Sequence, residues 1–118
     1  MFGRYPSGVS GPIIVTAAEA ERDQRAAAGA LAHGGLRPGD RVAIVAEASA
    51  AYLAVTLGAL RTGIVPVLLN PDLAPTEHAR LLADADASLV LADADLPPLL
   101  DGAPVDLAGA PARRARAR

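Results

Sequence analysis

The segment "RVAIVAEASAAYLAVTLGALRTGIVPVLLN", Arg41–Asn70, decides the fold because it contains a strand pattern, a helix pattern and a second strand pattern in succession. Its first part, Arg41–Ala46, is a continuous apolar run, which is typical of a strand buried on both faces of a parallel sheet. The middle part, Ala50–Arg61, is apolar nearly all the way round a helix. The last part, Ile64–Asn70, is a strand that contains Pro66. Proline cannot donate a ladder hydrogen bond, so this strand is expected at an edge or a bulge of the sheet.

A helix is predicted before this segment. Residues Ala17–His33 are rich in alanine, glutamate, arginine and glutamine, which are strong helix formers. Thr16 is a suitable N-cap, and Glu19 three residues later completes a capping box. Gly34 and Gly35 end the helix where a residue with positive φ is favoured.

A helix and a strand are predicted after the segment. Pro75–Asp86 is helical, with proline in the first turn, and Ser88–Ala92 is a third strand. The alternation of helices and strands predicts an α/β fold with a short parallel sheet and right-handed crossovers. "PIIVT", Pro12–Thr16, is a further short strand candidate.

Three regions organise the chain. Residues 1–11 mix Gly, Pro and Ser without periodicity and are expected to be a flexible lead-in. Residues 12–93 form the α/β domain. Residues 94–118 are proline-rich, end in a basic tail and are expected to be a disordered linker.

Composition excludes several classes of protein. The chain has no cysteine, which excludes disulfides, thiolate metal sites and thiol nucleophiles. All 11 basic residues are arginine, and four of them lie in the tail Ala112–Arg118, so the remaining sequence is acidic and does not favour nucleic-acid binding. The longest apolar stretch, Ala50–Leu60, is shorter than the ~20 residues of a membrane span. A cytoplasmic protein is expected.

The glycine-containing stretch "GGLRPGDRVAIVAE", Gly34–Glu47, has the composition of a phosphate loop but not its position in the chain. Phosphate-binding glycine loops follow a strand and begin a helix, whereas here the glycines end a helix and the strand comes afterward. The strand-to-helix turn, Ala46–Tyr52, has no glycine and carries the acidic Glu47. Neither turn is therefore predicted to bind a nucleotide.

The other reactive side chains are predicted to be structural or solvated. His33 and His78 lack metal-ligand spacing, Ser49 is interpreted as a helix cap, and Ser88 lies outside a nucleophile-elbow motif. Carboxylates can bind Mg²⁺ or exchange protons. Four aspartates lie at the ends of predicted helices or strands and are expected to be solvated instead: Asp84, Asp86, Asp93 and Asp95. No catalytic, cofactor-binding or metal-binding residue is predicted in the chain.

The order of these segments resembles a known family. Three stretches carry the resemblance: "LRPGDRVAIVAEAS", "LGALRTGIVPVLLNP" and "LAPTEHARLLADADASLVLAD". Together, residues Val15–Asp93 resemble the N-terminal part of the adenylate-forming superfamily of acyl-CoA synthetases, peptide-synthetase adenylation domains and luciferases. Ala74 stands where the family commonly has a capping threonine.

The resemblance implies a ligase that uses ATP and Mg²⁺ to convert a carboxylic acid, such as a fatty acid, into an acyl-adenylate and then into a CoA thioester. The family's phosphate loop and catalytic lysine have no counterpart here, since the sequence contains no lysine. The chain alone is therefore expected to be inactive and to bind no cofactor. A truncation or an altered reading frame near Asp93 is one hypothesis for this pattern.

An alternative remains open. The chain could be a non-catalytic binding or interaction module that uses an exposed sheet or helix face. The all-round apolar helix at Ala50–Leu60 motivates this alternative, which includes self-association through exposed apolar surface.

Overall fold

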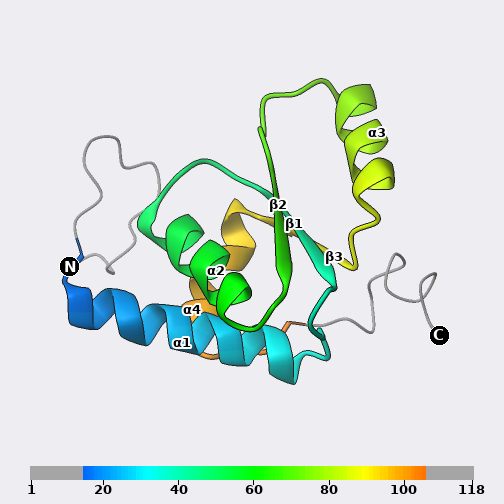
Figure 1. Cartoon of the computed structure of the whole chain (residues 1–118). Helices are drawn as coiled ribbons and strands as arrows, with labels where there is room; N and C mark the ends of the chain where they lie inside the picture. The colour runs from blue at the N-terminus through cyan, green and yellow to red at the C-terminus, as the bar shows by residue number, and fades with distance from the viewer. Residues whose placement is uncertain (1–14, 106–118) are drawn as a thin grey trace.

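A three-stranded parallel sheet with helices on both faces forms the described part of the chain, residues 15–105 of the computed structural model (Figure 1). The predicted α/β class is confirmed. In chain order the elements are α1 (Ala17–His33), β1 (Arg41–Val45), α2 (Ala50–Arg61), β2 (Val65–Leu69), α3 (Pro75–Ala85), β3 (Leu89–Ala92), a 3₁₀ turn (Asp93–Asp95) and α4 (Leu96–Leu100).

Strand β1 lies in the centre of the sheet and pairs in parallel with β2 on one side and β3 on the other. The Val65 N–H donates to the carbonyl oxygen of Asp40, 2.8 Å away. Because alternate residues of a strand direct their backbone groups to opposite sides, the nitrogen of Pro66 faces away from β1. The expectation that Pro66 lies on an edge strand is therefore confirmed, and its missing N–H costs the sheet no bond.

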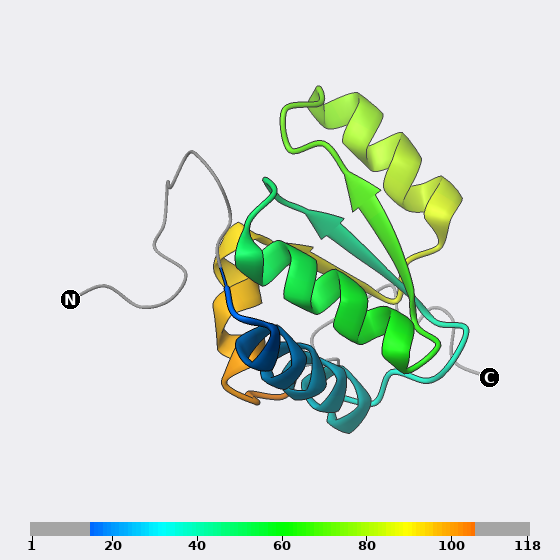
Figure 2. The same cartoon turned by 60° about the vertical axis from the view of Figure 1, so that its left-hand side comes forward.

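The helices form two unequal layers (Figure 2). Helices α1, α2 and α4 pack together on one face, where Val42 and Ile44 of β1 join the core. Helix α3 lies on the other face, above the buried Ala43. This division follows from right-handed crossovers, since β2 and β3 lie on opposite sides of β1.

The helix ends use the caps that the sequence predicts. The Thr16 hydroxyl accepts from the Glu19 N–H at 3.0 Å, and the Glu19 carboxylate accepts from the Thr16 N–H at 2.9 Å. At the other end of α1, Gly35 has a φ of 102°, which favours glycine. The Ser49 hydroxyl accepts from the Tyr52 N–H at 3.0 Å and begins α2. These local contacts satisfy backbone groups at the helix ends.

The segment after β3 differs from the disordered linker expected at residues 94–118. Leu96, Leu99 and Leu100 of α4 are buried against α1 and α2. Two prolines in the first turn are compatible with a helix because the first N–H groups need no intrahelical partner. A five-residue helix is too short to show a sequence period, which is why the segment resembled a linker. The core therefore continues past residue 93.

Two other expectations concern the ends of the chain. The lead-in and most of the strand candidate Pro12–Thr16 lie outside the described residues, and so does the tail from residue 106 onward. Val15 and Thr16, the described part of that candidate, are not in a strand. Within residues 15–105, no helix has the length and apolar character needed to cross a membrane.

Candidate functional site

The carboxyl edge of the sheet is the first place to look for a site. In open α/β folds, ligands bind outside the carboxyl ends of the strands, where consecutive crossovers leave in opposite directions. The strand order β2-β1-β3 brings the carboxyl ends of the three strands together at this edge. The chain places Glu47 just after β1 and Asp93 just after β3.

At this edge, carboxylate oxygens accept hydrogen bonds from backbone N–H groups. The Asp93 Oδ1 accepts from the Glu47 N–H at 3.1 Å, which joins the end of β3 to the end of β1. The Asp95 Oδ2 accepts from the Ala92 N–H at 2.8 Å. At the start of α2, the Ser49 hydroxyl accepts a hydrogen bond from the Tyr52 N–H. Carboxylates repel phosphate groups, so these side chains do not fit a nucleotide phosphate and instead stabilise the edge.

The loop after β2 holds the second part of this edge. The Asn70 side-chain oxygen accepts from the Asp72 N–H at 2.8 Å. The His78 Nε2 lies 2.7 Å from the carbonyl oxygen of Asn70, so this nitrogen is the donor. His78 thereby ties the loop to α3, while His33 lies exposed at the end of α1. Among the described residues, no group of three potential ligands could hold a metal ion.

The remaining candidates lie on α3 and in the turn that leads to β3. Asp84 is exposed and lies 3.8 Å from Arg80 on the same helix. Asp86 ends α3 in a left-handed conformation, with a φ of 52°. Ser88 is fully buried and its N–H donates to the carbonyl oxygen of Arg41 at 2.7 Å, so solvent does not reach it. The structure joins Asp93 to the backbone N–H of Glu47.

The glycines of the stretch Gly34–Glu47 come before β1 and lie at the opposite, amino edge of the sheet. The Gly39 N–H donates to the carbonyl oxygen of Gly63 at 2.8 Å, and the buried Asp40 carboxylate accepts from the Arg37 N–H at 2.9 Å. These internal bonds use the groups that a phosphate would need. The stretch is a helix-to-strand connection, as its position in the chain predicts.

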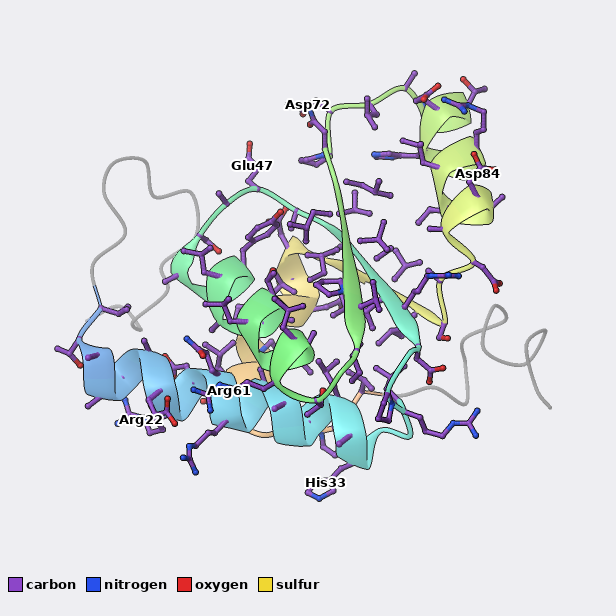
Figure 3. All side chains as sticks on the ribbon, in the orientation of Figure 1. Arg22, His33, Glu47, Arg61, Asp72 and Asp84 are labelled. Atoms are coloured by element: carbon purple, nitrogen blue, oxygen red, sulfur yellow. The ribbon has the colours of Figure 1, made fainter. Side chains whose placement is uncertain are left out.

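Charged side chains join α1 to α2 on the outer surface. Arg61 of α2 donates to both carboxylate oxygens of Glu21, and its Nε donates to the Gln24 side-chain oxygen at 3.0 Å (Figure 3). Arg25 donates to the same carboxylate at 2.6 Å. The hydrogen bonds from Arg61 and Arg25 hold the pKa of Glu21 below its usual value. We interpret this cluster as structural, because its side chains form hydrogen bonds with one another and connect α1 to α2.

Sequence reasoning did not locate the exposed apolar surface. Leu53, Leu57 and Leu60 of α2 and Leu68 of β2 are all exposed, and we call these four residues the α2–β2 surface. Their spacing in α2 is three and four residues, which places them on one side of the helix. The sequence shows an apolar helix but not which of its sides α1 and the sheet leave uncovered.

The fold defines the class: an α/β sheet of the kind found at the N-terminus of adenylate-forming enzymes. Residues 4–115 match the family described as AMP-binding enzyme, and the chain belongs to this family. The predicted resemblance to the N-terminal part of the superfamily is thereby confirmed.

Two relatives show which part of the family the chain represents. The 4-hydroxybenzoate–CoA/benzoate–CoA ligase of Rhodopseudomonas palustris is 36% identical over 77 residues, which are 65% of this chain and 14% of that protein. The fatty acid–[acyl-carrier-protein] ligase ScoC of Streptomyces coeruleorubidus is 30% identical over 90 residues, which are 76% of this chain and 17% of that protein. The chain therefore spans a small part of the length of these relatives.

Solved structures of CoA ligases and synthetases resemble the fold of this chain. A fatty acyl CoA synthetase of Mycobacterium tuberculosis superposes with a TM-score of 0.66 at 26% identity, over 83% of this chain and 23% of that one. A benzoate CoA ligase of Burkholderia xenovorans LB400 superposes with a TM-score of 0.65 at 32% identity, over 75% of this chain and 18% of that one. The chain resembles the N-terminal region of acyl-CoA ligases.

Proposed function

We propose that these 118 residues supply the N-terminal sheet segment of an ATP-dependent acid–thiol ligase and do not catalyse the reaction alone. The full reaction would activate a carboxylic acid as an acyl-adenylate and transfer the acyl group to CoA. Two matches carry the proposal: residues 4–115 match the family of AMP-binding enzymes, and 77 residues match only 14% of the length of the R. palustris ligase.

The chemistry of the described side chains supports the inactivity of this segment. Activation of a carboxylate by ATP needs cationic groups for the phosphates, and the sequence has no lysine and no Ser/Thr/Gly-rich phosphate loop. At the carboxyl edge, Asp93 and Asp95 accept from backbone amides. These acidic side chains do not fit the phosphates of ATP or CoA, so in this proposal other parts of a complete ligase bind them. We place such a ligase in the cytoplasm.

Pyrophosphate exchange tests the proposal. The purified chain is incubated with ATP, Mg²⁺, labelled pyrophosphate and a panel of benzoates and fatty acids, with the R. palustris ligase as the active control. We expect no acid-dependent exchange above the enzyme-free blank, while circular dichroism shows a cooperative melt of the same sample. Exchange that the paired substitutions Glu47→Gln and Asp93→Asn abolish would contradict the proposal.

A second candidate function is a non-catalytic interaction module. The α2–β2 surface favours it, because four large apolar side chains face solvent on adjoining elements. Different experiments test the two proposed functions, because the first concerns catalysis and the second concerns association with a partner.

A further inference from the structure

We draw no further inference here: the strongest candidate, the α2–β2 surface beside the edge of the sheet, lies on a chain that matches only 14% of the length of the R. palustris ligase, and nothing in residues 15–105 shows what covers it.

Discussion

Gly58 is a position where α2 closely approaches the backbone of α1, and Gly58→Ala tests that contact. A Cβ atom at residue 58 would lie 2.8 Å from the carbonyl oxygen of Gln24, 3.0 Å from the Ala27 Cβ and 3.1 Å from the Ala28 nitrogen. Two of these atoms belong to the α1 backbone, which cannot rotate away as a side chain can. The helices must therefore separate, although Ala27 and Ala28 are buried in their interface.

The size of the effect follows from two opposing terms. Replacing glycine by alanine inside a helix stabilises it by about 1 kcal/mol. Overpacking a close contact costs about 1–3 kcal/mol, and here the contact involves rigid backbone, so the upper part of that range applies. We expect Gly58→Ala to lower the free energy of unfolding by about 1–2 kcal/mol, or the Tm by about 4–8 °C for each kcal/mol in a domain of this size.

Gly29→Ala in α1 is the matched control. A Cβ atom at Gly29 would meet no atom within 4 Å, so the gain in helix propensity should remain and the Tm should rise. Thermal and urea unfolding followed by circular dichroism measures both variants. Equal stabilisation by the two substitutions would refute the close packing of α1 on α2.

Three further predictions concern the core, a cap and a charge. Leu96→Ala should lower the free energy of unfolding by about 2–5 kcal/mol in urea titrations, because Leu96 is only 1% exposed; no loss would restore the linker interpretation of its segment. Ala74→Ser should raise that free energy by about 0.5–2 kcal/mol, because Ala74 is the N-cap of α3 and has no side-chain acceptor; an unchanged urea midpoint would contradict this. Glu21→Gln should lower the Tm at pH 7, and its difference from the wild type should shrink as the pH falls below about 4.3. A lowered pKa in the folded state stabilises above the unfolded-state pKa and loses that contribution as the pH falls through the folded-state pKa, so a Tm difference that did not shrink on acidification would contradict the contact with Arg61.

Part of the carboxyl edge could be read from the sequence. Ser49 was identifiable as a cap because its partner, the Tyr52 N–H, lies three residues away. The bond from the Glu47 N–H to Asp93 was not identifiable, because these residues are 46 positions apart and only the pairing of β1 with β3 brings them together. Propensity and spacing report local contacts, so the sequence indicated the exposure of Asp93 and Asp95 but not the hydrogen bond from the Glu47 N–H to Asp93.

The sequence by itself determined the alternation of helices and strands, the parallel sheet, the caps at Thr16 and Ser49 and the edge position of Pro66. Each of these features depends on periodicity or on residues that are close in the sequence. Both can be read directly from the order of the amino acids. Tertiary structure alone decided that α4 belongs to the core and that α2 leaves one row of leucines uncovered. Burial depends on which elements meet in space, and a short helix or a uniformly apolar one carries no local signal of its neighbours.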